Sequence, residues 1–223
     1  YSNLATGRIV EGNEIKPGVA GAADISVTYK TPIKMGERKG EFTFGTAISN
    51  IGSKITYTNS DNRDYIPTNL GIGGGLKLQL DEFNTITFTT DFNKLLVPTP
   101  RPDLGDADGN NVVDYKEYSP VRGIFKSFGD APGGFSEEMK EITVGIGAEY
   151  WYDNQFAVRM GHFREHYSKG NRKYFSVGLG VKYNIFGLNF SYLVPTSNQR
   201  NPLDNTLRFS LVFDFSAFDS DEE

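Results

Sequence analysis

Residues 207–215 read Leu-Arg-Phe-Ser-Leu-Val-Phe-Asp-Phe, and this stretch decides the fold class. Its large apolar residues take every second position, whereas Arg208, Ser210 and Asp214 stand between them. A period of two places the two sets on opposite faces of a β-strand. The stretch therefore predicts a strand with one apolar face and one polar face.

The same alternation recurs toward the N-terminus in segments of about ten residues. We predict nine such strands, at 22–30, 41–49, 70–78, 85–92, 142–152, 156–161, 173–183, 188–192 and 206–215. Charged residues inside the strands fall on the face opposite the apolar series, and small residues share that face. These predicted polar-face charges are Asp24, Lys77, Asp91, Glu149, Arg159, Lys182, Arg208 and Asp214.

Two architectures fit this patterning. A soluble sandwich turns its polar face to water and packs its apolar face in a core between two sheets. A membrane barrel turns its apolar face to lipid and its charged, glycine-rich face to the lumen. The alternation alone leaves both architectures open.

The lengths of the connections favour the barrel. Segments 81–84, 153–154 and 184–187 are tight turns at alternate ends of successive strands. Other connections are long, at about 5–19, 51–68, 97–139, 164–172 and 195–205, and 31–40 falls on the short-turn side. Short periplasmic turns, long extracellular loops and aromatic residues near the turns are typical of outer-membrane barrels. We therefore predict an all-β transmembrane antiparallel β-barrel in a bacterial outer membrane, surrounded by lipid.

Composition agrees with this class. The chain has 223 residues, a net charge of −5 and no cysteine. No run of eighteen apolar residues occurs, which argues against a transmembrane helix, and the mild acidity argues against binding of nucleic acid. Single-chain bacterial barrels have an even number of strands, so nine strands and the lack of a signal peptide predict that N-terminal strands are missing. We expect 1–215 to form the C-terminal part of one barrel, closed by Phe215, and 216–223 to be an acidic periplasmic tail.

Several segments resemble the PorV (LptO) family, FadL-like outer-membrane proteins of the Bacteroidota type IX secretion system. They are Gly45–Ser53, Gly123–Glu141, Glu149–Val158, Gly170–Phe175 and Asn205–Phe215. The resemblance implies a barrel of fourteen strands, of which this chain supplies about nine. It implies a protein that is not an enzyme, binds the C-terminal signal domain of secreted cargo at the translocon barrel, and delivers the cargo to the cell-surface attachment complex with its sortase.

Other functions remain open at this point. A FadL-like transporter of hydrophobic small molecules would need an apolar luminal pocket, and the predicted luminal positions here are small or charged. A Ser–His–acid hydrolase would need His162 or His166, the only histidines, and His162 falls on the predicted outward face. We therefore expect no catalytic residues.

The long connection 97–139 contains a pattern typical of calcium loops. Oxygen ligands at loop positions 1, 3, 5, 7, 9 and 12 would come from Asp106, Asp108, Asn110, the Val112 carbonyl, Asp114 and Glu117. Asn111 stands where such loops place glycine. A surface turn rich in Asp, Asn and Gly explains the same residues without a metal, and no cofactor is otherwise expected.

The same connection carries large apolar residues, which a water-exposed loop would not be expected to contain. Pro120–Phe128 is predicted to form a short helix. Its apolar side chains either plug the barrel mouth or meet a partner protein. We predict that this connection and the loop 51–68 together form the partner surface. The candidate partner-binding residues are Tyr57, Tyr65, Ile66 and Pro67 of the loop 51–68, and Ile124, Phe125, Phe128 and Phe135 of the connection 97–139.

Overall fold

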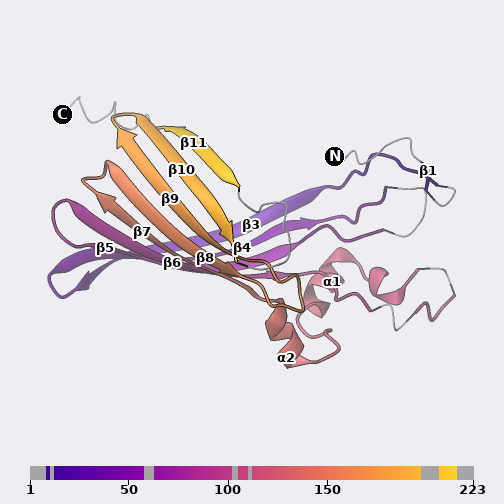
Figure 1. The fold of residues 1–223 in the computed structure, drawn as a ribbon. Coiled ribbons are helices and arrows are strands. Elements are labelled where there is room, and N and C mark those ends of the chain that lie inside the picture. The colour runs from indigo at the N-terminus through magenta and orange to yellow at the C-terminus, as the bar shows by residue number, and fades with distance from the viewer. Residues whose placement is uncertain are drawn as a thin grey trace. The chain divides into compact units, whose positions relative to one another are not determined.

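The computed structural model describes residues 9–10, 13–57, 63–101, 105–109, 112–196 and 206–214. Its main feature is one nine-stranded sheet in the order β11-β10-β9-β8-β7-β6-β5-β4-β3, so each strand lies beside its neighbours in sequence (Figure 1). The strands are β3 (Ala22–Met35), β4 (Arg38–Gly52), β5 (Asn69–Gln79), β6 (Asn84–Leu95), β7 (Thr143–Tyr152), β8 (Phe156–Arg164), β9 (Lys173–Tyr183), β10 (Phe186–Pro195) and β11 (Leu207–Phe213). A separate pair joins β1 (Ile9–Val10) to β2 (Asn13–Glu14). The all-β class and the nine strands are confirmed.

Among the residues that the structure describes, helical structure is confined to the connection between β6 and β7. It consists of η2 (Asp114–Lys116), α1 (Pro120–Lys126), α2 (Phe135–Glu138) and η3 (Met139–Glu141). The predicted helix at 120–128 is thus confirmed, although it ends two residues earlier. Within the described part of the chain, no helix is long and apolar enough to cross a membrane.

The connection predicted at 31–40 is wrong, because β3 and β4 are longer than their alternation indicated. They have 14 and 15 residues, and only Gly36 and Glu37 remain between them. Gly36 has a φ of +63°, which glycine adopts without strain. At the β7–β8 turn, Asp153 and Asn154 have φ values of 50° and 51°, as the two-residue hairpin turn with a right-handed strand twist requires. The four short turns therefore follow β3, β5, β7 and β9.

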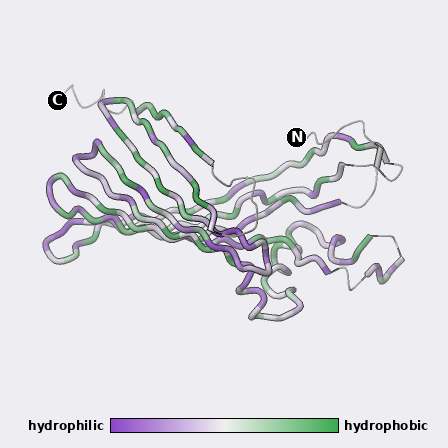
Figure 2. Tube along the Cα trace, viewed as in Figure 1, coloured by the Kyte–Doolittle hydropathy of each residue, from purple (hydrophilic) through white to green (hydrophobic). Residues whose placement is uncertain are grey.

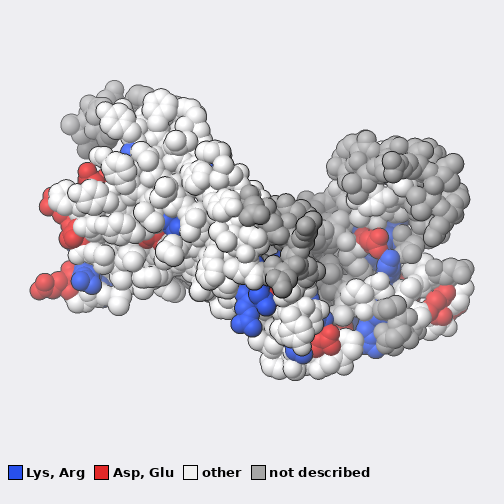
Figure 3. Space-filling model, in the orientation of Figure 1, with Lys and Arg blue, Asp and Glu red and all other residues white. Residues whose placement is uncertain are grey.

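The strand faces differ in exposure in the opposite sense to a water-soluble sheet. On the apolar face Val158 is 50% exposed and Leu179 is 55% exposed, whereas Ala157 on the other face is 2% exposed. Figure 2 shows the alternation along the strands, and Figure 3 shows few charged side chains over them on the face in view. Among the described residues the buried apolar side chains are only Leu96, Ala131 and Ala157. A sandwich would bury its apolar face in a core, so this structure does not support the sandwich alternative.

The chain divides into two compact units. The first comprises Tyr1–Val27, Thr46–Gly71 and Asn93–Glu141, and the second comprises Thr28–Gly45, Ile72–Phe92 and Ile142–Glu223. The first unit contains the helical connection and the long loops before β5. The second contains the antiparallel pairs β7–β8, β8–β9, β9–β10 and β10–β11.

Candidate functional site

In the first unit, Tyr65 holds two connections together. Its hydroxyl lies 2.8 Å from the Tyr118 carbonyl oxygen and 3.1 Å from that of Tyr115, and its ring lies 4.6 Å from the Lys54 Nζ. Burial, with Tyr118 and Tyr115 nearby, raises the pKa of Tyr65 to about 12, so the hydroxyl keeps the proton that it donates. Lys116 forms an ion pair with Asp64 at 2.6 Å. These contacts fix residues 115–118 against Asp64 and Tyr65.

A buried ion cluster attaches the helical connection to the end of β6. The Lys94 ammonium donates to Glu138 at 2.8 Å and to Glu141 at 2.6 Å, and all three side chains are at least four-fifths buried. Glu138 also accepts from the Ala131 amide, and Asp130 accepts from the Thr99 amide and hydroxyl at 3.0 Å each. A buried charge is tolerated when it is paired and hydrogen-bonded in this way.

This cluster lies on the apolar side of β6. Asn93 faces Asn69 and Gly71 on the polar face, where its carbonyl oxygen accepts a bond from the Asn69 amide at 3.1 Å. Successive side chains of a strand point to opposite faces, so Lys94 points to the other side. Through Lys94, the connection after β6 therefore packs against the apolar face of the strand end.

Helix α1 has an inner face of small residues and an outer face of large ones. Gly123 is buried, and a Cβ there would lie 3.1 Å from Tyr65 and from Pro98. Ser127 is fully buried and donates to the Ile124 carbonyl at 2.8 Å. Phe125, by contrast, is 74% exposed. Val121 and Phe125 thus lie on the side of α1 opposite these contacts, and Ile124 is half-buried.

The predicted partner-binding residues fall into two groups. Phe125, Phe128 and Phe135 are exposed large apolar side chains, with Phe135 at 80%. Tyr57, Tyr65, Ile66 and Ile124 are half-buried, and Pro67 is exposed. The sequence did not show this division, because it depends on which side of α1 packs against Tyr65 and Pro98.

On the polar face of the second unit, one arginine links residues of β7, β8 and β10. Arg159 of β8 pairs with Glu149 of β7 at 2.5 Å and donates to Asn189 of β10 at 2.8 Å. To reach β10 it crosses β9 at Gly180, where an added Cβ would lie 2.7 Å from the arginine Nη1. The ring of Trp151 lies 5.3 Å from the guanidinium. Glycine in β9 is therefore what lets this network form.

The other predicted polar-face charges have varied surroundings. Lys182 pairs with Asp214 at 2.8 Å across β10, and Asp24 accepts from the Asn50 amide at 2.7 Å. Asp91 lies over Gly73, and Lys77 and Arg208 are exposed. Their assignment to a lumen stays a prediction. Phe215 and the acidic tail at 216–223 lie outside the described residues.

The predicted calcium ligands lie in a turn held by its own carboxylates. Asp106 accepts from the Gly109 amide at 2.7 Å, and Asp114 accepts from the Ala107 amide at 3.0 Å. Asn110 is outside the described residues. In the part of the chain that the structure describes, no group of three His, Cys, Asp or Glu side chains has the arrangement of a metal site. Calcium binding therefore stays a prediction.

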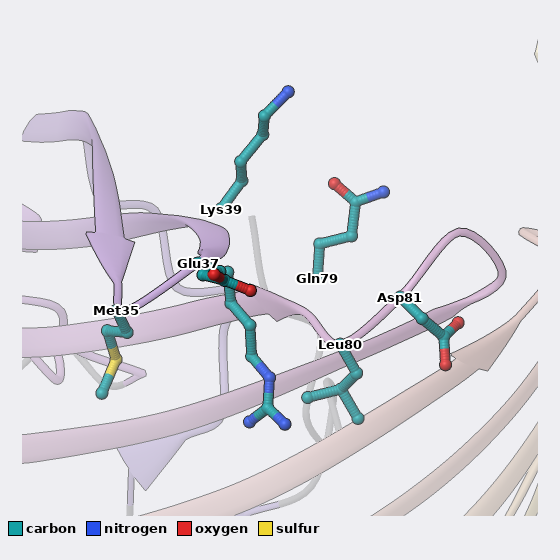
Figure 4. A pocket seen from close by; sticks show the side chains of 7 residues that line it. Met35, Glu37, Lys39, Gln79, Leu80 and Asp81 are labelled. Atoms are coloured by element: carbon teal, nitrogen blue, oxygen red, sulfur yellow. The ribbon is translucent and has the colours of Figure 1, made fainter.

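A hollow that the sequence did not predict lies at two of the short turns. It has a volume of about 640 Å³ and is lined by Met35, Glu37, Arg38, Lys39, Gln79, Leu80 and Asp81 (Figure 4). Asp81 is committed to its own turn, because it accepts from the side chain of Asn84 and from the amides of Phe83 and Asn84. These bonds, led by that from the Asn84 side chain, lower the pKa of Asp81. The mixed charges of the lining indicate no particular ligand.

Comparison with known proteins gives one family. The model of the family described as type IX secretion system protein PorV matches residues 8–102. Over these residues the chain is similar to that family. The match includes the segment Gly45–Ser53, on which part of the resemblance rested, and covers less than half of the 223 residues. No curated protein matches the chain. The PorV family implies a component of the type IX secretion system.

Proposed function

We propose that this chain forms part of an outer-membrane β-barrel, with the apolar strand faces in contact with lipid. The exposure of Val158, Leu179 and Phe209, at 50%, 55% and 67%, supports the proposal, because water is a poor solvent for three such side chains on one face of the sheet. The polar face, with its ion pairs and glycines, then belongs to the lumen. Fourteen strands in the complete barrel follow from the PorV resemblance and belong to the proposal.

Within the secretion system, we propose that the protein is a non-enzymatic shuttle. It binds the C-terminal signal domain of cargo at the translocon barrel and delivers the cargo to the sortase-containing attachment complex. The PorV match over residues 8–102 is the observation that carries this proposal.

The docking surface of the proposal consists of Phe125, Phe128 and Phe135. Their exposure, and the packing of the connection on the outward side of β6, favour contact with a partner over plugging of the barrel mouth. Aromatic side chains are enriched at the centres of protein interfaces, where each can carry a large share of the binding energy. The buried support of Tyr65 and Gly123 reduces the ordering cost of binding.

The test compares two variants in the native membrane. The first replaces Phe125, Phe128 and Phe135 with serine, and the control replaces Tyr167, an aromatic residue of the β8–β9 connection that is 71% exposed. We expect the triple variant to lose translocon and cargo on purification and to leave cargo unattached, whereas Tyr167→Ser keeps both. Unchanged copurification by the triple variant would remove this docking surface from the account.

The same purification addresses the transporter alternative. A FadL-like transporter needs an apolar luminal pocket, whereas the polar face of the described hairpins presents Glu149, Arg159 and Asn189 with glycines between them. Copurifying lipid in the absence of any secretion protein would favour the transporter. Copurifying translocon or cargo would favour the shuttle.

A further inference from the structure

Two cations stand opposite each other where β8 and β9 meet their long connection. Arg164, the last residue of β8, is the direct cross-strand partner of Lys173, the first residue of β9. Directly opposed residues have Cα atoms about 4.5–5.5 Å apart, and like charges in that relation destabilise a sheet. The acid next in sequence, Glu165, is engaged by Arg172 through both oxygens, at 2.8 and 2.9 Å. Among the described residues, neither Arg164 nor Lys173 has an ion-pair partner.

The two cations lie on the apolar face of the sheet. Arg164 alternates in register with Met160, which is 63% exposed, and Lys173 alternates with Val177, which is 44% exposed. The neighbouring strands extend the same row across the sheet. Val144 of β7 lies opposite Arg164, and the Thr196 amide after β10 donates to the Lys173 carbonyl at 2.9 Å.

The next row toward the strand middles separates the row of Arg164 and Lys173 from the rest of the apolar face. It contains Ile146, His162 and Phe175 in direct register. The His162 and Phe175 rings lie 4.5 Å apart, and the His162 Nδ1 is buried without a hydrogen-bond partner among the described residues. Toward the strand middles the same face continues with exposed Met160, Val177 and Leu179. A cationic row thus caps several rows of exposed apolar side chains.

We propose that Arg164 and Lys173 bind a phosphate group carried by a lipid of the leaflet on the long-connection side. The proposal rests on the membrane location proposed above. A phosphate accepts bonds from a guanidinium and an ammonium at once, and its charge cancels their repulsion. A lipid phosphate fits better than a free one, because the acyl chains of the same molecule would lie along Phe175, Val177 and Met160. Arginine and lysine at this depth also keep their charges at the headgroup level while their stems cover apolar surface.

The test measures lipid binding by the purified protein in detergent. Phosphatidylglycerol, phosphatidylcholine with the same acyl chains, and inorganic phosphate are titrated separately, with native mass spectrometry and the melting temperature as readouts. We expect phosphatidylglycerol to bind most tightly, because the choline group of phosphatidylcholine would bring a third cation next to Arg164 and Lys173. The double variant Arg164→Gln, Lys173→Gln should lose affinity about tenfold or more, the usual effect of removing a charged hydrogen-bond donor. The control, Lys77→Gln with Arg208→Gln, removes two cations of the polar face and should bind like the original protein.

Each other outcome overturns the proposal. Equal affinity in the double variant and the original protein removes Arg164 and Lys173 from lipid binding. Stabilisation by inorganic phosphate as strong as by phosphatidylglycerol makes the pair a site for a free anion. Insertion of the original protein into vesicles is measured in parallel. Normal insertion without preference for phosphatidylglycerol refutes the lipid site alone, whereas failure to insert refutes the membrane location.

Discussion

The replacement of Leu179 by arginine separates lipid contact from water contact at the middle of β9. Leu179 is 55% exposed and lies opposite Val158 and Phe190 on the apolar face. An arginine at the bilayer midplane of a barrel's lipid face costs about 2–4 kcal/mol, whereas surface substitutions in water usually change stability by about 0.5 kcal/mol or less. The account therefore predicts a loss of about 2–4 kcal/mol in the free energy of unfolding.

The assay is urea-dependent unfolding in phosphatidylcholine vesicles, followed by the fluorescence of Trp151, the single tryptophan of the chain. Two controls accompany it. Leu179→Met keeps size and hydrophobicity and should cost under about 1.5 kcal/mol. Ser210→Arg places the same charge in the middle of β11, opposite Asn189 on the polar face, and should cost much less than Leu179→Arg. A loss below about 0.5 kcal/mol for Leu179→Arg, with a larger one for Ser210→Arg, would show that the lipid-facing and luminal sides are assigned the wrong way round.

Three further predictions concern the polar network, a loop and the calcium pattern. Gly180→Val should lower the free energy of unfolding by about 1–3 kcal/mol in the same assay, because the new Cβ would lie 2.7 Å from Arg159 and 2.9 Å from Asn189. The control is Gly187→Ala, whose Cβ would lie 3.5 Å from Val212. Equal losses of stability in the two variants would count against the network. Burial alone would raise the pKa of Glu165, but the bonds and charge of Arg172 lower it overall, below its ordinary value of 4.5. The Glu165–Arg172 ion pair therefore stabilises the connection above pH 4.5, and this stabilisation is lost as pH falls through the folded-state pKa of Glu165. Hydrogen exchange of the amides in 165–172 should become faster over this pH range, and Glu165→Gln should abolish that pH dependence. The same pH profile in both proteins would refute the prediction. Calcium at millimolar concentration should release or absorb heat on titration, and Asp108→Asn should weaken the effect; no heat above buffer would leave an acidic turn without metal.

Much of the fold could be predicted because a strand with one apolar face has apolar residues at every second position of its sequence. Leu207–Phe213 and Lys173–Tyr183 were located in this way. The turn at 153–154 followed from its Asp and Asn content, whereas the turn predicted at 184–187 is shorter, because β10 already begins at Phe186. The end of β3 was missed although Ile33 and Met35 continue its alternation, and the start of β4 was missed because residues 38–41 carry no large apolar side chain. Backbone hydrogen bonding extends a hairpin to its turn regardless of side-chain hydrophobicity.

The candidate sites were less predictable, because they depend on contacts between distant segments. The helix at 120–128 was expected, but its packing against Tyr65 and Pro98 through Gly123 could not be derived from spacing. The opposition of Arg164 and Lys173 likewise depends on the register of β8 with β9, which the connection 165–172 sets. A shift of one residue would have moved each side chain to the other face.

The central claim, that the apolar faces of the sheet meet lipid, is tested most directly along β9. The chain has no cysteine, so single cysteines at 175–182 can each carry a nitroxide label in vesicles without a background signal. Collisions with oxygen, which concentrates in lipid, are compared with collisions with a water-soluble nickel complex. The account predicts that positions 175, 177, 179 and 181 favour oxygen and that 176, 178, 180 and 182 do not, with a period of two. Nickel contact at 177 and 179 as high as at an extracellular label at 168 would contradict it.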